Sequence, residues 1–320
     1  MKIIDYWKEI KNGKKKSGFR EEIHMRSFPG YMVIGRNGED AGIFSDYLVF
    51  LGEIEFAVVR GYTPIIDLQN YPRFCIQDTD KYYKENAWEY FFEQPCGLGL
   101  DDISNLIGHI VYAPADFGSK VFHGMKLHRV WKEDEQLFHY WREMARRYIR
   151  LKPDVLRECE NEFCKIRGGV SKIVGVAIRE GYYLGQMKRG KAGGGYDERK
   201  VNVNRFIKET EKLLAQDKEI NGIFVSCEFE GTIQKFQSRF PDKKILFVDK
   251  ERFTSPSRYP YEPEDRKVYF DQKNKREIAL NYIKEIFVLS KCDSYIYSEC
   301  SGSVAVLLLK KENFDRCVYI

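Results

Sequence analysis

Two polar segments in the second half of the sequence follow apolar runs, and their residue types suit a phosphate-containing ligand. Arg179 comes after the run at residues 173–178, and Glu228 comes after the run at residues 222–226. A guanidinium can clamp a diphosphate with paired hydrogen bonds and keeps its charge at any working pH. A carboxylate such as Glu228 suits a ribose hydroxyl or the edge of a base. The plainer alternatives are a surface arginine paired with a carboxylate and an exposed loop glutamate.

A third segment, Ser301-Gly302-Ser303, separates an apolar run at residues 294–297 from a helical pattern at residues 303–310. Small residues let the backbone approach a phosphate, and the start of a helix offers unpaired N–H groups and the positive end of its dipole. An ordinary serine N-cap is the alternative. Together with Arg179, this turn indicates a site that neutralises the negative charge of a departing nucleoside diphosphate.

The elements that position these three segments alternate between strand and helix. The pattern predicts strands at residues 173–178, 222–226, 244–248, 294–297 and 318–320, and helices at residues 203–215, 232–240, 276–290 and 303–310. Such a series predicts a doubly wound parallel sheet, which binds ligands where its strands end at their C-terminal edge.

The first half of the sequence contains a shorter series of the same kind. A strand at residues 31–35, a helix at 43–60 and a strand at 65–67 predict a parallel βαβ unit, and an amphipathic helix is expected at residues 134–151. We therefore predict an α/β protein of two Rossmann-like domains with parallel sheets facing a cleft. Residues 1–165 form the N-terminal domain on the acceptor side, and residues 166–320 form the domain that binds the nucleotide.

Composition bounds the class of protein. The chain has 320 residues, of which 43% are hydrophobic and 32% charged, as in a soluble globular protein. The formal net charge of +5 is spread over mixed signs, so nucleic acid is not expected as a partner. The eight cysteines form no C-x-x-C motif, and neither a signal peptide nor a bilayer-spanning run is visible, so we expect a cytoplasmic protein with reduced thiols. The basic run Lys14-Lys15-Lys16 suits peripheral contact with an anionic membrane, with a solvated helix as the alternative.

Candidate residues in the first half are less sharply defined. Trp88 and Tyr90 belong to an aromatic segment at residues 86–95 that is either a sugar platform for the acceptor or a piece of the core. Glu93 and Asp40 are candidate general bases for an acceptor hydroxyl. The D-x-D at Asp78-Thr79-Asp80 follows too short a strand to predict a metal site.

These features together resemble the fucosyltransferase superfamily, which includes α1,6-, nodulation and protein O-fucosyltransferases and bacterial relatives of surface-polysaccharide synthesis. The resemblance rests on Arg179 after its strand, on Glu285 in its helix and on the Ser301-Gly302-Ser303 turn. Residues 61–67 and 86–95 extend it into the first half. It implies a GT-B fold, a GDP-sugar donor in the C-terminal domain, inverting transfer and no metal ion.

The resemblance also implies roles for individual residues. Arg179 would bind the β-phosphate, Glu228 and Glu285 would contact the donor's ribose or base, and the turn from Ser301 through Gly302 to Ser303 would hold phosphate. The family's usual pattern is His-x-Arg followed shortly by Thr-Asp. Ala177 stands here in the histidine position, and Glu180-Gly181-Tyr182 replaces the later residues.

The sequence therefore predicts an inverting, metal-independent glycosyltransferase without a cofactor. The expected donor is GDP-fucose or another GDP-sugar, and the expected acceptor is a cell-surface glycan or its lipid-linked precursor. Three alternatives remain open: a UDP-sugar enzyme, a catalytically altered protein that binds a sugar or nucleotide, and a dinucleotide enzyme. A dinucleotide enzyme requires a glycine fingerprint after its first strand, and Gly35-Arg36-Asn37-Gly38 of this sequence does not supply one.

Overall fold

The chain divides into two compact units, Met1–Lys152 and Pro153–Ile320. The computed structural model describes residues 30–37, 42–71, 75, 84–114, 134–180, 202–255 and 273–320. The predicted domain boundary at residues 165 and 166 lies within helix α7 (Pro153–Arg167), which belongs to the second unit. Several predicted features lie outside the described residues: the N-terminal basic segment, Asp40, the D-x-D at residues 78–80, and Gly181 and Tyr182.

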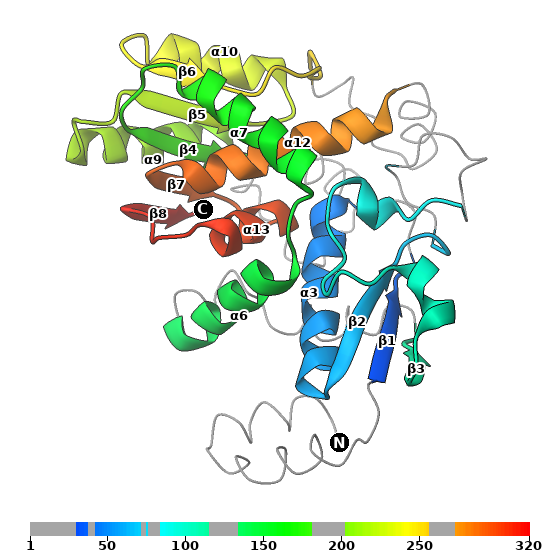
Figure 1. The fold of residues 1–320 in the computed structure, drawn as a ribbon. Coiled ribbons are helices and arrows are strands. Elements are labelled where there is room, and N and C mark those ends of the chain that lie inside the picture. Colours follow the sequence, from blue (N-terminus) through cyan, green and yellow to red (C-terminus); the bar gives the residue numbers. More distant parts are fainter. Residues whose placement is uncertain are drawn as a thin grey trace, which may run out of the picture. The chain divides into compact units, whose positions relative to one another are not determined.

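The first unit is built on a parallel sheet of three strands (Figure 1). Strand β1 (Gly30–Gly35) lies between β2 (Tyr62–Asp67) and β3 (His109–Tyr112). Helix α3 (Ile43–Val59) joins β1 to β2 and packs against both, which confirms the predicted βαβ unit. Helix α6 (Glu135–Tyr148) packs on α3, and its first turn is capped by the Asp134 carboxylate.

Two buried amides fasten the segment after β2 to the end of that strand. The Gln94 side chain accepts a hydrogen bond from the Ile66 N–H and donates one to the Ile66 carbonyl, both at 2.8 Å. Asn86 accepts from the Leu68 N–H at 3.1 Å and also donates to the Ile66 carbonyl. Both amides donate to the Glu89 carboxylate between them. The segment, which includes the 3-10 helix η2 (Ala87–Tyr90), therefore continues the hydrogen bonding of the sheet through side chains.

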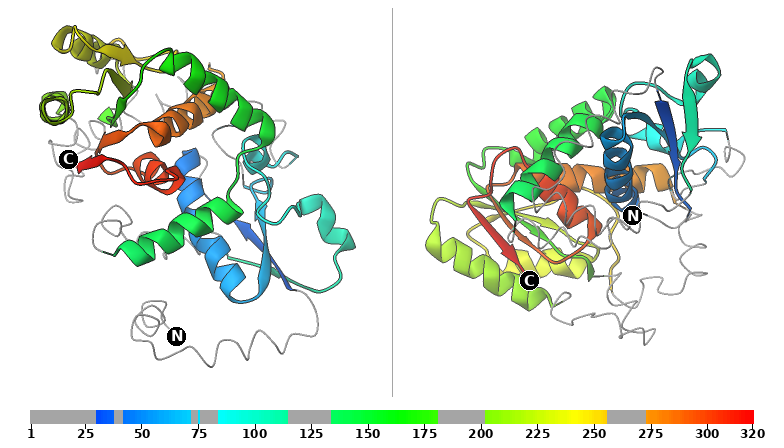
Figure 2. Two further views of the ribbon diagram at one scale, coloured as in Figure 1. Left: turned by 60° about the vertical axis from the view of Figure 1, so that its left-hand side comes forward. Right: turned by 90° about the horizontal axis from the view of Figure 1, so that it is seen from below.

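The second unit contains a five-stranded parallel sheet in the order β6-β5-β4-β7-β8. Its strands are β4 (Ile173–Ala177), β5 (Gly222–Ser226), β6 (Lys244–Leu246), β7 (Ser294–Tyr297) and β8 (Arg316–Tyr319). Figures 1 and 2 show α9 (Val203–Gln216) and α10 (Glu230–Arg239) on one face, with α7 and α12 (Lys275–Lys291) on the other. Helix α13 (Ser301–Leu309) packs against α12. The predicted doubly wound sheet is confirmed.

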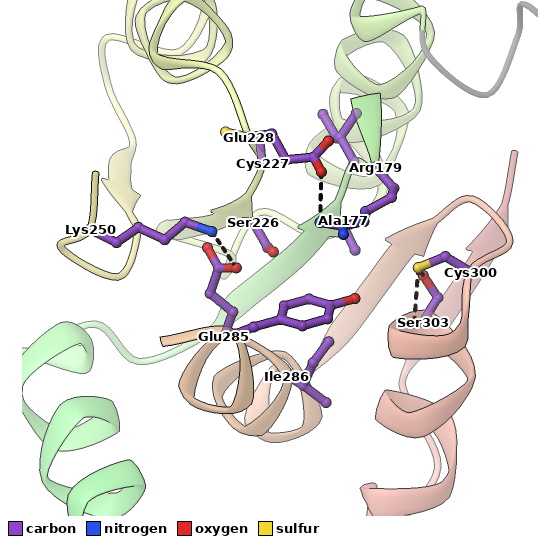
Figure 3. A pocket seen from close by; sticks show the side chains of 12 residues that line it. Ala177, Arg179, Ser226, Cys227, Glu228, Lys250, Glu285, Ile286, Cys300 and Ser303 are labelled. Carbon is purple, nitrogen blue, oxygen red and sulfur yellow. Dashed lines mark hydrogen bonds and ion pairs between the residues drawn. The ribbon is translucent and has the colours of Figure 1, made fainter. Parts of the chain in front are cut away.

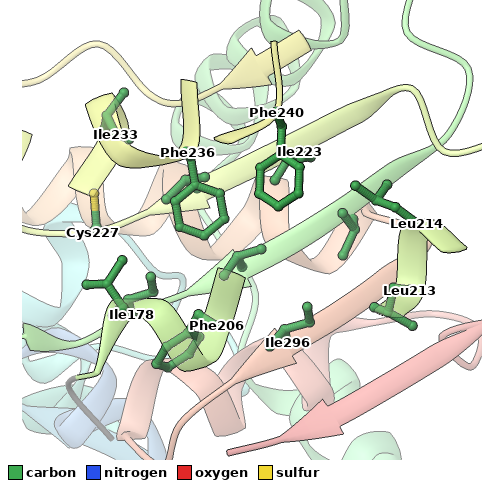
Figure 4. Packing of buried hydrophobic residues seen from close by; sticks show 14 of the residues in the cluster. Ile178, Phe206, Leu213, Leu214, Ile223, Cys227, Ile233, Phe236, Phe240 and Ile296 are labelled. Carbon is green, nitrogen blue, oxygen red and sulfur yellow. The ribbon is translucent and has the colours of Figure 1, made fainter. Parts of the chain in front are cut away.

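Alternation along β4 separates two kinds of packing. Val174 and Val176 point toward α9 and α10, where they join a core that includes Phe206 and Phe236 (Figure 4). Gly175 points to the other face, where a Cβ would lie 2.9 Å from Leu289 Cδ2 and 3.0 Å from Cys292 Sγ. Helix α12 and the turn that follows it therefore approach β4 more closely than any larger side chain would allow.

The structure differs from the expected elements mainly at their ends. Helix α6 ends at Tyr148 rather than continuing to residue 151, and Pro153 begins α7 instead of only interrupting a helix. Strand β3 was not expected, because its four residues are half-buried or exposed and show no clear alternation. All eight cysteines are free thiols. Among the described helices, none is long and apolar enough to cross a membrane.

The paired hydrogen bonds of Gln94 generate the first prediction. Gln94→Met keeps the size of the side chain but leaves the Ile66 N–H and carbonyl without these partners inside the core. We expect the free energy of unfolding to fall by about 2 kcal/mol, measured by urea denaturation. Gln136→Met, at an exposed position of α6, should change it by less than about 0.5 kcal/mol. Equal effects of the two substitutions would contradict this role of Gln94.

Candidate functional site

The strand order of the second sheet reverses beside β4. The chain passes from β4 to β5 and β6 on one side, and then crosses through α12 to β7 on the other side. In doubly wound sheets, ligands bind outside the C-terminal ends of the strands at such a reversal. A pocket lies at this point (Figure 3). It is lined by Ala177, Ile178, Arg179, Ser226, Cys227, Glu228, Lys250, Tyr282, Glu285, Ile286, Cys300 and Ser303.

Arg179 enters the pocket from the end of β4 and is held on two sides. Its Nη1 lies 2.7 Å from Glu228 Oε1, and Glu228 follows β5. Its Cζ lies 5.1 Å from the centre of the Tyr282 ring, within the range of a cation–π contact. The arginine side chain is 37% exposed, whereas the Glu228 side chain is 10% exposed. The predicted arginine and glutamate are therefore brought together, and both line the pocket.

A second ion pair lies on the β6 side of the pocket. Lys250 Nζ is 2.7 Å from Glu285 Oε2, and the Glu285 side chain is only 1% exposed. Arg252 adds a longer contact of 4.0 Å to the other carboxylate oxygen, which has no hydrogen bond within the described residues. Lys250 and Glu285 both line the pocket, and the lysine pairs with one of the two carboxylate oxygens. The lysine itself is 18% exposed.

The predicted turn at residues 301–303 is the first turn of α13. Its N-cap is Cys300, whose sulfur accepts from the Ser303 N–H at 3.3 Å and lies 3.1 Å from the Ser303 hydroxyl oxygen. By helix geometry, the amides of Ser301 and Gly302 have no partner inside the helix, so this end of α13 is suited to an anion. The cap is thus a thiol rather than the serine expected in the plainer alternative.

Position 302 has no room for a side chain larger than that of glycine. A Cβ at this position would overlap the Tyr282 hydroxyl and would lie 2.9 Å from Tyr282 Cζ and 3.0 Å from Ile286 Cδ1. The predicted role of the glycine was to let a phosphate approach. In the structure, the Tyr282 hydroxyl occupies the space beside it. Burial raises the pKa of Tyr282 well above its ordinary value, so this hydroxyl is neutral.

Glu180, which departs from the family pattern, is buried next to the pocket. Its Oε1 accepts a hydrogen bond of 2.8 Å from the Thr232 hydroxyl. Burial, with a smaller contribution from the nearby Glu228 charge, raises the pKa of Glu180 to about 8. At neutral pH this carboxyl is therefore mainly protonated, and it adds little negative charge beside Arg179.

The predicted residues of the first unit have different surroundings. Trp88 is fully buried: it stacks on Phe92 with ring centres 4.4 Å apart, and its indole N–H donates to the Glu93 carbonyl at 3.0 Å. Its ring is therefore part of the core and is not available as a platform for an acceptor in this conformation. Tyr90 is half-buried, and its hydroxyl contacts Glu85. The Glu93 carboxylate forms a partly exposed ion pair of 2.7 Å with Arg150.

Three groups of the pocket were missed by sequence reasoning: Tyr282, Lys250 and Cys300. Tyr282 precedes Glu285 by three residues, so the two side chains share one face of the helix. The role predicted for Glu285 could therefore have pointed to Tyr282 as well. Lys250 follows β6 as Glu228 follows β5. Because ligands bind where parallel strands end, the same reasoning could have identified Lys250. Within the part of the chain that the structure describes, no group of three or more His, Cys, Asp or Glu residues is placed to hold a metal ion.

The fold is similar to that of solved fucosyltransferase structures, although the sequences differ widely. No protein-family model matches the sequence, and no curated protein is significantly similar to it. The fucosyltransferase NodZ from Bradyrhizobium is 12% identical, with a TM-score of 0.51 over 87% of this chain and 92% of that chain. NodZ α-1,6-fucosyltransferase soaked with GDP-fucose gives 13% identity and a TM-score of 0.52 over 88% and 92%. POFUT1 in its apo form gives 9% identity and a TM-score of 0.50 over 92% and 99%.

These similarities confirm the predicted fold class, an α/β protein with two parallel sheets in the fold of the fucosyltransferases. They extend over most of each compared chain. At identities of 9–13%, they establish the fold alone, because the chemistry depends on the particular residues of this pocket.

The contact between Gly302 and Tyr282 generates a second prediction. Gly302→Ala should lower the free energy of unfolding by about 1–3 kcal/mol, because the new methyl group overlaps the tyrosine hydroxyl. Tyr282→Phe removes that oxygen, so Gly302→Ala should cost less in the Tyr282→Phe background than in the wild type. Urea denaturation of the four proteins completes the cycle. An equal cost in both backgrounds would show that the hydroxyl is not the obstacle.

Glu180 generates a third prediction, on pH. Its pKa rises from an ordinary value of 4.5 in the unfolded chain to about 8 in the folded protein. The folded protein therefore binds a proton that the unfolded chain has released, and stability falls as pH rises through this window, by at most about 1.4 kcal/mol per pH unit. Glu180→Gln should remove this contribution, measured by urea denaturation at pH 5, 6.5 and 8. The exposed Glu219→Gln should keep the wild-type dependence, and an unchanged slope in Glu180→Gln would exclude the assignment.

Proposed function

We propose that this chain is a glycosyltransferase that uses a nucleotide sugar, with GDP-fucose or another GDP-sugar as donor. One observation carries the proposal: Arg179 lies between Glu228 and Tyr282 at the reversal of the sheet, in a pocket that the first turn of α13 also lines. This places a fixed cation and a helix N-terminus at the edge where doubly wound sheets bind nucleotides. The similarity in fold to NodZ, whose structure was also determined after soaking with GDP-fucose, favours the same class of donor.

In this proposal, Arg179 and the start of α13 bind the diphosphate. Breaking the bond between the sugar and the β-phosphate leaves negative charge on the nucleoside diphosphate, and a preorganised guanidinium stabilises that charge as it develops. The guanidinium has five N–H donors, so it can bind phosphate oxygens while Glu228 still orients it. Arginine and helix amides thereby supply the charge stabilisation that a metal ion supplies in other transferases, and we propose metal-independent transfer.

The other end of the pocket would hold the nucleoside. Glu228 is 10% exposed and suits a ribose hydroxyl, whereas Glu285 is paired with Lys250. An ammonium beside a carboxylate offers a donor and an acceptor side by side, which matches the carbonyl and N–H groups on the edge of guanine.

The acceptor is proposed to bind on the side of the first unit. For inverting transfer, an acceptor hydroxyl attacks the anomeric carbon as the bond to the phosphate breaks, and a carboxylate takes the hydroxyl proton. Glu93 and Asp40 are the proposed bases. Glu93 is 37% exposed and paired with Arg150, so its carboxylate is accessible to a ligand. A glycan of the cell surface or its lipid-linked precursor is the proposed acceptor class, with membrane contact through the basic segment near residue 14.

A second function is favoured by Ala177. This residue ends β4 and lines the pocket with a methyl group, where the resembled family has an imidazole. The protein would then bind a nucleotide sugar without transferring it. Release of free nucleoside diphosphate from the donor distinguishes the two functions, because only the enzyme turns the donor over.

The fourth prediction tests the proposed function. Arg179→Ala should weaken GDP binding by about 100-fold and abolish hydrolysis of the donor, because the charge-assisted hydrogen bonds to phosphate are lost. Calorimetry measures the binding, and a thermal melt without ligand checks the fold. The matched control is Arg239→Ala, which removes an exposed arginine of the same unit that pairs with Glu211. Wild-type activity in Arg179→Ala would refute the mechanism.

Thermal-shift measurements on the wild-type protein identify the donor. GDP-, UDP-, CMP- and dTDP-sugars are compared by thermal shift with and without EDTA. Stabilisation by GDP-sugars alone, unchanged by EDTA, is the expected result. Selective stabilisation by a UDP-sugar would replace the donor but keep the class of enzyme. No shift with any of these compounds would reject a nucleotide-sugar site.

A further inference from the structure

Tyr282 connects the two parts of the pocket that are proposed to bind the diphosphate. Its ring faces the Arg179 guanidinium, with 5.1 Å from Arg179 Cζ to the ring centre. Its hydroxyl lies against Gly302, in the first turn of α13. One side chain of α12 thus contacts both the arginine that follows β4 and the helix that follows β7.

Packing around α12 fixes the position of the Tyr282 side chain in the pocket. Tyr282, Glu285 and Ile286 are separated by three and four residues, so they share one face of α12 and all line the pocket. The helix cannot withdraw easily, because Leu289 and Cys292 pack against Gly175 and because Glu285 is paired with Lys250. At the far end of the ring, only the absence of a side chain at Gly302 admits the hydroxyl. The ring is therefore held at both ends.

The arginine needs such a support. Its side chain is long and 37% exposed, and an ion pair at that exposure contributes little to holding one conformation. A free arginine loses rotamer entropy when it binds a ligand, which weakens binding. Glu228 contacts the guanidinium from the β5 side, and the Tyr282 ring contacts it from the α12 side. Two contacts from different elements restrict the guanidinium within the pocket that the first turn of α13 also lines.

We infer that Tyr282 is a positioning residue, whose aromatic face holds the Arg179 guanidinium ready for the diphosphate of the donor. This inference rests on the proposed function. The ring face acts on the arginine, and the hydroxyl serves to seat the ring against Gly302. An alternative role, in which the hydroxyl itself donates to the phosphate, makes the opposite prediction for phenylalanine at this position.

The fifth prediction compares two substitutions by calorimetry with GDP. Tyr282→Phe keeps the aromatic face and should bind GDP within about twofold of the wild type. Tyr282→Leu removes the face and should weaken binding about fivefold, the equivalent of about 1 kcal/mol for a cation–π contact at 1.4 kcal/mol per tenfold. In the Arg179→Ala background, Tyr282→Leu should add no further loss, because the ring acts through the arginine. A structural effect of leucine would persist in that background.

A second measurement does not depend on leucine being tolerated. Phenylalanine and its mono-, di- and trifluorinated analogues are incorporated at position 282. Fluorine withdraws electron density from the ring face with little change in size, so cation binding weakens stepwise. GDP affinity should fall in the order of fluorination while the melting temperature without ligand stays within a few degrees. The same series in Arg179→Ala should be flat.

Several results would overturn the inference. Equal losses in Tyr282→Phe and Tyr282→Leu would assign the effect to the hydroxyl, and a flat fluorination series would exclude the ring face. Additive losses in the Arg179→Ala background would show that Tyr282 does not act through the arginine. Failure of the proposed function is distinct from all of these. In that case, Arg179→Ala itself would bind GDP like the wild type, or the wild-type protein would not bind GDP.

Discussion

After β6, the chain returns through α12 to the opposite side of β4, and this reversal determines where the candidate site lies. Because all five strands are parallel, the segments after β4, β5, β6 and β7 reach the same edge of the sheet. The strand order brings together groups that are far apart in sequence, namely Arg179, Glu228, Lys250 and the start of α13. The pocket is thus a consequence of connectivity, and its chemistry depends on which side chains follow each strand.

Helix α12 sets the shape of this pocket. The face of β4 that meets the helix carries Ile173 and the small residues Gly175 and Ala177, whereas the other face carries Val174 and Val176. The small residues let α12 approach, and its polar side chains then extend into the pocket among residues that are otherwise largely buried. Glu285 is stabilised there by Lys250, and removal of one partner of such a buried pair is costly. The fold therefore places the Glu285 carboxylate in the pocket together with its lysine.

Among the described residues that line the pocket, charge is balanced rather than strongly positive. Each cation that lines it, Arg179 or Lys250, faces a carboxylate, and Glu180 nearby is mainly protonated at neutral pH. Binding of an anion here would rely on oriented donors, namely the guanidinium and the first amides of α13, more than on net charge. Donors held in place before the ligand arrives lose little entropy on binding, and this is the physical basis of the positioning role inferred for Tyr282.

Local sequence patterns were sufficient to predict the α/β class, the parallel series of the second unit, and the positions of Arg179 and Glu228 after β4 and β5. These follow from local periodicity and from the rule for strand ends, and the predicted strands at residues 222–226 and 294–297 have the observed bounds. Tertiary packing places Trp88 in the core, pairs Lys250 with Glu285, and brings Tyr282 to Arg179. Sequence could not decide these points, because burial and contact depend on how closely elements from distant parts of the chain pack.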